Sequence, residues 1–224
     1  MEDNYNAWAY ALNTFGISLD KNDYFMLEGL SAKDVAKKFL LYLSDVALSD
    51  MIVSLKEQHY ISHHSFEFYP SAIELIENLK KKDFKLAIVS GANSQRLERT
   101  VSESFLNNFE AIVTGDGIHE SKPSPEPYLK VSEKLGVIPR ECLVVENAPL
   151  GIESAKKAGM TCIAVTSTLE KKYLIKADRV VSNIIEIQEI CKAGNLDFHN
   201  EIYAGDHRVD KKQLKKIFKQ YIEH

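Results

Sequence analysis

Hydrophobic residues at helical spacing dominate the first third of the chain. Trp8, Leu12 and Phe15 recur at intervals of three and four, and the same spacing returns in the segments that follow. The pattern predicts four helices over residues 3 to about 65, with no strand signal between them. We therefore expect a compact antiparallel helical subdomain over residues 1–66.

Polar residues mark where these helices begin. Asp20 or Asn22 is suited to cap a short helix that runs to about Glu28. Ser31 stands before an apolar-periodic run that starts at Val35, which is typical of an N-cap residue.

The pattern changes at Pro70, where short apolar runs begin to alternate with helical segments. The strand-like runs are Phe84–Val89, Glu110–Thr114, Leu143–Val145, Thr161–Val165 and Ala177–Val181. Strands that alternate with helices predict an α/β fold with a doubly wound parallel sheet and right-handed crossovers. We expect this α/β core to extend over residues 67–194.

The last segment, residues 195–224, has a different pattern. Its first half has no clean period, while its end carries an apolar stripe at helical spacing: Leu214, Ile217, Phe218, Tyr221 and Ile222. Such a stripe requires a surface to cover. We predict a C-terminal extension whose amphipathic helix packs on this chain or mediates self-association.

Polar residues follow three of the predicted strands, where a parallel sheet binds its ligands. Ser90, Gly91 and Ala92 combine a hydroxyl with backbone N–H groups at the start of a helix, which suits a phosphate, although Ser-Gly is common in such turns. Lys122 offers a positive charge to the same edge, or is a solvated loop lysine. Glu146 and Asn147 offer oxygen ligands for Mg²⁺, or end a strand and cap a helix.

Composition narrows the function classes. The 224 residues carry a formal net charge of −4, and the local lysine clusters suit helix ends, so we predict no nucleic-acid partner. The three cysteines form no metal-binding pair, and we interpret them as buried thiols in a reducing compartment. There is no apolar run of membrane-spanning length and no signal-peptide pattern. These features predict a cytoplasmic protein without a membrane partner.

The order and local sequence of these motifs resemble the haloacid dehalogenase-like superfamily, in particular its beta-phosphoglucomutase-like branch. Ser90 in LAIVSGANS resembles the phosphate-binding motif, Lys122 in KPSPEPYL the lysine motif, and Glu146 with Asn147 in VVENAPLGIESAKKAGM the magnesium motif. The segment AWAYALNTFGISL and the EGLSAKDVA that follows resemble the branch's helical cap. The resemblance covers residues 3 to about 192.

The resemblance implies a Rossmann-like core with a helical cap and Mg²⁺-dependent phosphoryl transfer through an aspartyl-phosphate. It implies a small phosphorylated metabolite as ligand and Lys122 as a catalytic group. In the cap, it places Glu28 and Ser31 toward the substrate. Sugar-phosphate mutases of the branch typically carry Lys where Glu28 stands, so we favour a hydrolase over a mutase, with a pyrophosphatase as a further alternative.

The sequence departs from the family at its first motif. The branch carries a strand that ends in Asp-x-Asp before the cap, and the given chain has no such segment. In the family this strand is central, between the strands that end in Ser90 and Glu146. We therefore expect the given chain to be inactive. Three explanations stay open: a truncated longer enzyme, a non-catalytic relative in which residues 197–204 fill the slot, or completion by a second chain.

A smaller departure is Asn147, which stands where many relatives carry a second Asp. An amide offers Mg²⁺ an oxygen without charge, so we expect weaker metal binding.

Overall fold

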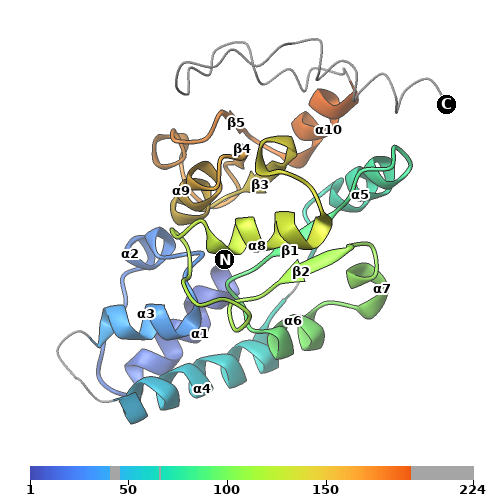
Figure 1. The fold of residues 1–224 in the computed structure, drawn as a ribbon. Helices are drawn as coiled ribbons and strands as arrows, with labels where there is room; N and C mark the ends of the chain where they lie inside the picture. The colour runs from blue at the N-terminus through green and yellow to red at the C-terminus, as the bar shows by residue number, and fades with distance from the viewer. Residues whose placement is uncertain (41–45, 66, 193–224) are drawn as a thin grey trace.

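The computed structural model describes residues 1–40, 46–65 and 67–192. The first four helices are α1 (Glu2–Asn13), α2 (Lys21–Met26), α3 (Ala32–Phe39) and α4 (Val46–His63). They gather at one end of the molecule, at the lower left of Figure 1. The predicted C-terminal extension and its amphipathic helix lie outside the described residues.

Side-chain caps start two of these helices as the sequence predicts. Of the two candidates for α2, Asp20 is the cap, and its Oδ1 accepts hydrogen bonds from the backbone N–H of Asn22 and Asp23 at 2.8 and 3.0 Å. Ser31 caps α3, with Oγ accepting from the N–H of Asp34 at 3.2 Å. Each cap satisfies a donor that the helix leaves unpaired.

Strands and helices alternate in the rest of the described chain. The helices are α5 (Ala72–Lys80), α6 (Ser94–Thr100), α7 (Glu103–Leu106), α8 (Glu126–Leu135), α9 (Pro149–Lys157) and α10 (Ile184–Lys192), with 3₁₀ turns at Pro139–Glu141 and Lys171–Tyr173. The strands are β1 (Ala87–Val89), β2 (Ala111–Val113), β3 (Leu143–Glu146), β4 (Thr161–Val165) and β5 (Arg179–Val181).

The strands form two parallel sheets where one was predicted. β1 pairs with β2, and β3, β4 and β5 form the second sheet in that order. In Figure 1 the labels run β5, β4, β3, β1, β2 from top to bottom. The division falls between the strands that precede Ser90 and Asn147, where the resemblance places a further central strand.

Several boundaries differ from the sequence prediction, and β2 and β5 are each shorter than the predicted strands. One helix was expected from Ser94 to Phe105, but the chain breaks it at Val101, whose φ of −122° and ψ of 133° are extended. Val101 is buried and β-branched, and Ser102 restarts the chain as the N-cap position of α7. β1 is also shorter than the apolar run Phe84–Val89, because only residues 87–89 pair with β2.

One hydrophobic cluster runs from the N-terminal helices into the α/β part. It joins Trp8 and Leu12 of α1 to Val144 of β3 and Ile152 of α9. A smaller cluster packs α10 on β4 and β5. The helical segment therefore packs directly against the α/β part. The predicted boundaries at residues 66/67 and 194/195 stay predictions.

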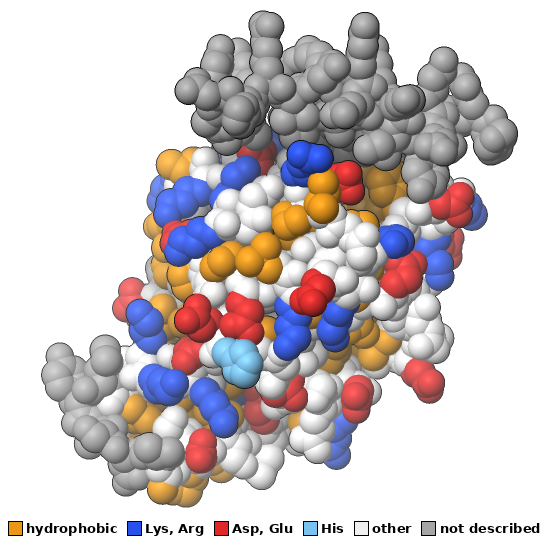
Figure 2. All heavy atoms as spheres, in the orientation of Figure 1, with side chains coloured by type: hydrophobic (Ala, Val, Ile, Leu, Met, Phe, Trp, Pro, Cys, Tyr) orange, Lys and Arg blue, Asp and Glu red, His pale blue; other side chains and the backbone are white. Residues whose placement is uncertain are grey.

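Charges of both signs are interspersed on the face of the molecule drawn in Figure 2. Within the described residues, we find no helix with the length and apolar character needed to cross a bilayer.

Candidate functional site

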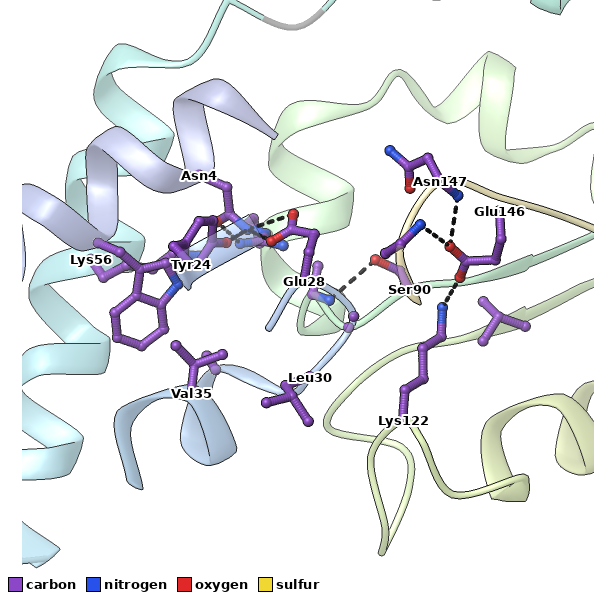
Figure 3. A pocket seen from close by; sticks show the side chains of 18 residues that line it. Asn4, Tyr24, Glu28, Leu30, Val35, Lys56, Ser90, Lys122, Glu146 and Asn147 are labelled. Atoms are coloured by element: carbon purple, nitrogen blue, oxygen red, sulfur yellow. Dashed lines mark hydrogen bonds and ion pairs between the residues drawn. The ribbon is translucent and has the colours of Figure 1, made fainter. Parts of the chain in front are cut away.

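A cavity of about 180 Å³ lies at the carboxyl ends of β1 and β3, beneath the N-terminal helices. The α/β part of the chain contributes every one of its predicted site residues to the lining: Ser90, Gly91, Ala92, Lys122, Glu146 and Asn147. Figure 3 shows Ser90, Lys122, Glu146 and Asn147 on one side of the cavity and the labelled residues of the helical segment on the other. The sequence prediction that three separate loops converge here is therefore consistent with the geometry.

The turn after β1 is a tight polar loop. Ser90 continues the ladder, with its N–H donating to the carbonyl of Val113 at 2.9 Å. Its Oγ accepts from the N–H of Ala92 at 3.1 Å, and Asn93 then caps α6 by accepting from the N–H of Arg96 at 2.7 Å. Because Oγ acts as an acceptor toward Ala92, the hydroxyl proton of Ser90 is available to donate to a ligand.

Gly91 is needed where this turn meets the helical segment. A β-carbon at position 91 would lie 2.7 Å from the carbonyl oxygen of Leu30 and 3.1 Å from that of Gly29. No real β-carbon fits at such a distance from backbone. The close approach holds the loop after α2 directly against the Ser90 turn.

Lys122 is buried beside the same turn. Its side chain is 6% exposed, and Nζ forms an ion pair with Oε1 of Glu146. Nζ also lies 5.1 Å from the centroid of the Tyr128 ring. The sequence left open a solvated loop lysine, and burial of Lys122 at the cavity favours the functional interpretation.

Glu146 has a hydrogen-bond donor on each of its acceptor sites. Oε1 accepts from Lys122 and from the hydroxyl of Tyr128 at 2.8 Å. Oε2 accepts from the N–H groups of Asn147 and Ala148 at 2.9 and 3.2 Å. Since a carboxylate offers about four lone-pair sites, this one is saturated.

Burial and the contacts around Glu146 shift the pKa values of Glu146 and Tyr128. Burial acts to raise the pKa of Glu146, but the charge and hydrogen bond of Lys122, with Tyr128 and the backbone, bring that pKa below its ordinary value. Burial and the Glu146 charge raise the pKa of Tyr128 well above 10. Glu146 is thus held as a carboxylate, with Tyr128 as a neutral donor.

The predicted magnesium ligands do not fit the ion by themselves. A cation at Glu146 would have to displace Lys122, Tyr128 or the backbone donors. Asn147 turns its Nδ2 toward Sδ of Met1 at 3.1 Å and Oγ of Ser167 at 3.3 Å, which leaves one neutral amide oxygen to offer. Among the described residues no three His, Cys, Asp or Glu side chains gather as a metal site. Magnesium binding here would require carboxylates from elsewhere.

The two predicted cap residues have different positions. Glu28 lines the cavity, where Asn4 Nδ2 donates to its two carboxylate oxygens at 3.3 and 3.5 Å. Ser31 is not among the described residues that line it. The hydroxyl of Ser31 donates instead to Oδ2 of Asp34 at 2.7 Å while it caps α3. A substrate role for Ser31 stays a prediction.

Sequence reasoning missed the polar residues at the helical end of the cavity. They are Asn4, Tyr24, Lys56 and Arg96. They come from four different helices, and no local motif marks them. The one signal was that Lys56 shares a helix face with Ile52 and Tyr60, one turn to either side. In the structure Lys56 is 1% exposed and paired with Glu57.

Comparison with known proteins identifies the family. The sequence profile of the haloacid dehalogenase-like hydrolases matches residues 2–165. The chain belongs to this family. Its fold agrees with that of a putative beta-phosphoglucomutase from Bacteroides vulgatus, with a TM-score of 0.78 and 24% identity over 89% of this chain and 84% of that one.

Two curated relatives match the chain over different lengths. It is 26% identical to hexitol phosphatase A from Escherichia coli over 181 residues, which is 81% of this chain and 83% of that protein. It is 36% identical over 108 residues, or 47% of this chain, to protein SUPPRESSOR OF QUENCHING 1, chloroplastic, from Arabidopsis thaliana. The chain spans only 10% of the length of that second relative.

Proposed function

We propose that this chain binds and positions a small phosphate monoester for hydrolysis, with the phosphate held between the Ser90 turn and Lys122. The observation that carries the proposal is the position of Ser90 and Lys122 on one cavity at the carboxyl edge of parallel strands. The relatives that are phosphatases support the reaction class.

Ser90, Lys122 and Glu146 have different roles in binding the phosphate. The Ser90 hydroxyl donates its proton to a phosphate oxygen. Lys122 carries three N–H donors, of which Glu146 accepts from one, so Lys122 can offset phosphate charge while Glu146 holds it in place. The burial of the pair strengthens its electrostatic effect on a bound anion.

Hydrolysis also requires a nucleophile. The carboxylates that line the cavity among the described residues are Glu28 and Glu146, and both are held by donors. β1 and β3 pair with no strand on their facing edges within the described chain. A parallel strand inserted there would end at the cavity. We place the family's Asp-x-Asp on such a strand, supplied by a longer form of the protein or by a second chain.

Magnesium dependence and a cytoplasmic location stay predictions of this proposal. The metal would be held by the added aspartates together with Asn147, since Glu146 is saturated here.

Phosphate binding is the direct test. Titration calorimetry of the chain with inorganic phosphate should give a binding isotherm that Ser90→Ala weakens about tenfold or more, corresponding to loss of a hydrogen bond to a charged group. The matched control is Ser104→Ala, an exposed serine in α7. If phosphate does not bind, or binds Ser90→Ala equally well, the proposal is wrong.

A second assay tests the reaction. With Mg²⁺, the 224-residue chain should not turn over p-nitrophenyl phosphate, whereas a version extended at its N-terminus by an apolar strand ending in Asp-x-Asp should. In that extended version the double variant Lys122→Met/Glu146→Gln, which leaves no unpaired charge, should lose about a hundredfold or more in kcat. Lys81→Met, an exposed lysine in the turn after α5, is the control.

A non-catalytic phosphate-binding protein is the second candidate. It is favoured because hydrogen-bond donors already contact both carboxylates that line the cavity within the described residues, Glu28 and Glu146. Phosphate binding without turnover in every extended version would support this alternative.

A further inference from the structure

The end of the cavity opposite the phosphate-binding turn is built by the helical segment and one residue of α6. Asn4, Tyr24, Glu28 and Lys56 come from the helical segment, and Arg96 comes from α6 of the α/β part. Figure 3 shows Asn4, Tyr24 and Glu28 close together, away from Ser90 and Lys122. In a bound phosphate ester, this end would face the group to which the phosphate is attached.

Arg96 determines how Asn4 is oriented. Its Nη1 donates to Oδ1 of Asn4 at 3.0 Å. Because a guanidinium only donates, the amide oxygen of Asn4 must face it, and the amide nitrogen must point the other way. That nitrogen donates to the hydroxyl of Tyr24 at 2.6 Å and to Glu28 at 3.3 Å. Arg96 therefore acts on Glu28 through Asn4.

Glu28 retains capacity to accept hydrogen bonds. Asn4 shares one long hydrogen bond between its two oxygens. Burial, together with the Glu28 charge and a hydrogen bond to Glu28, raises the pKa of Tyr24 well above 10, so Tyr24 is a second, neutral donor. Two donors leave about half of the carboxylate's acceptor sites for a ligand.

The cations at this end have a partner already. Lys56 Nζ and Arg96 Nη1 lie 3.0 and 3.5 Å from the same oxygen of Glu57. The guanidinium of Arg96 also lies 4.8 Å from the centroid of the Tyr60 ring. The two cations, Glu57 and Glu28 sum to a formal charge of zero. A second anionic group on a ligand would be repelled by Glu28, and neither cation has charge to spare for it. A hydroxyl, in contrast, can donate a hydrogen bond to Glu28.

We infer that Arg96 is a positioning residue which, through Asn4, holds the Glu28 carboxylate to accept hydrogen bonds from hydroxyls of an uncharged leaving group, and that Glu28 disfavours phosphate esters carrying a second anionic group. The inference rests on the proposed function, because it takes the Ser90 end as the phosphate site. It names the substrate class as monophosphates of small polyhydroxylated compounds.

Two ligands of nearly equal size test the selectivity by titration calorimetry at pH 7. Glycerol 3-phosphate ends in a hydroxymethyl group, and 3-phosphoglycerate carries a carboxylate in its place. The unchanged chain should bind glycerol 3-phosphate at least tenfold more tightly. Glu28→Gln should bring the ratio of the two affinities close to one, while its affinity for inorganic phosphate does not fall.

The role of Arg96 needs its own variants. Arg96→Met should lower the affinity for glycerol 3-phosphate relative to that for inorganic phosphate, because Asn4 no longer holds Glu28 toward the ligand hydroxyls. Arg96→Lys, which keeps a donor for Asn4, should restore part of that affinity. Arg99→Met, at an exposed position of the same helix, is the control and should keep the affinities of the unchanged chain for both ligands. A general loss of structure would lower the affinity for inorganic phosphate as well, so that affinity separates positioning from stability.

The outcomes separate the two proposals. If inorganic phosphate does not bind, or binds Ser90→Ala as tightly as the unchanged chain, the proposed phosphate site is wrong and so is this inference. If phosphate binds as proposed but the unchanged chain shows no preference, or Glu28→Gln keeps the preference, this inference alone is overturned. An affinity for glycerol 3-phosphate, relative to inorganic phosphate, that Arg96→Met leaves unchanged would overturn the positioning role of Arg96.

Discussion

The carboxylate of Glu146 occupies the space that a side chain on Gly151 would need. A β-carbon built on Gly151, in the first turn of α9, would overlap both oxygens and the carboxyl carbon of Glu146. Gly151 has no strained backbone that requires glycine, since its φ is not positive. Glycine is therefore required only because a side chain would not fit. Its absence of a side chain allows the buried ion pair of Glu146 and Lys122 to lie against the N-terminus of α9.

Replacing Gly151 with alanine should destabilise the protein. Alanine favours a helix over glycine by about 1 kcal/mol, yet we expect Gly151→Ala to lower the free energy of unfolding by about 1–3 kcal/mol through overpacking. Urea denaturation measures this. In the double variant with Glu146→Ala, the clash is gone, so the cost of the alanine should largely vanish. Equal costs with and without Glu146 would contradict the close approach.

Lys122 should be costly to remove at neutral pH and less so in acid. Lys122→Met leaves a buried carboxylate without its cation, which we expect to cost about 3–5 kcal/mol in unfolding free energy at pH 7. Without the ammonium, burial raises the pKa of Glu146 in the folded variant above the unfolded value of about 4.3. The folded variant then takes up a proton first, so its deficit should shrink between pH 7 and 5.

In the unchanged chain, Glu146 should make the free energy of unfolding fall as the pH is lowered. The pKa of Glu146 is lowered in the folded state, so the stabilisation is present above about pH 4.3 and is lost as the pH falls through the lowered value. Urea denaturation at a series of pH values measures the free energy of unfolding of the unchanged chain and of Lys122→Met. The double variant Lys122→Met/Glu146→Gln is the control, and its stability should not follow this pH dependence. A deficit of Lys122→Met that is the same at pH 5 and 7 would contradict the buried pair.

Tyr128→Phe removes one donor from the saturated carboxylate. The hydroxyl donates to Oε1 of Glu146 at 2.8 Å and is buried. Loss of a hydrogen bond to a charged group costs about 1.5–3 kcal/mol, and we expect the unfolding free energy to fall by that amount. Tyr173→Phe, at a tyrosine that is 40% exposed, should change it by less than about 0.5 kcal/mol. Equal effects would mean that the hydrogen bond contributes nothing.

The sequence predicted the parts of the site that depend on local pattern. Ser90, Lys122 and Glu146 each follow an apolar strand or precede a proline-opened helix, and parallel strands bring such positions to one edge. Their mutual contacts were not predictable in detail. Saturation of Glu146 depends on Tyr128, which lies 18 residues away and which the helical pattern marks only as apolar.

Apart from Glu28, the residues at the helical end of the cavity could not be predicted from the sequence. Arg96 and Asn4 are 92 residues apart, and their hydrogen bond exists only because the helical segment lies on α6. The extended backbone at Val101, which ends α6, was likewise unpredicted, since a helical apolar period continues across it. The two-sheet arrangement follows from pairing partners, which a strand's own residues do not specify.

Lys56 offers a last test, at alkaline pH. Burial, then the nearby Arg96 charge, lowers the pKa of Lys56 to about 8, against an unfolded value of about 10.4. Between these two values the unfolded chain binds more protons, so this group makes the unfolding free energy rise with pH, by at most about 1.4 kcal/mol per pH unit. Lys56→Met should lack that rise, whereas Lys38→Met, at an exposed position of α3, should keep it. Urea denaturation between pH 7 and 10 measures the difference between the variants, in which other titrating groups cancel. If Lys56→Met and Lys38→Met follow the same curve, Lys56 titrates at its ordinary pKa and is not buried as described.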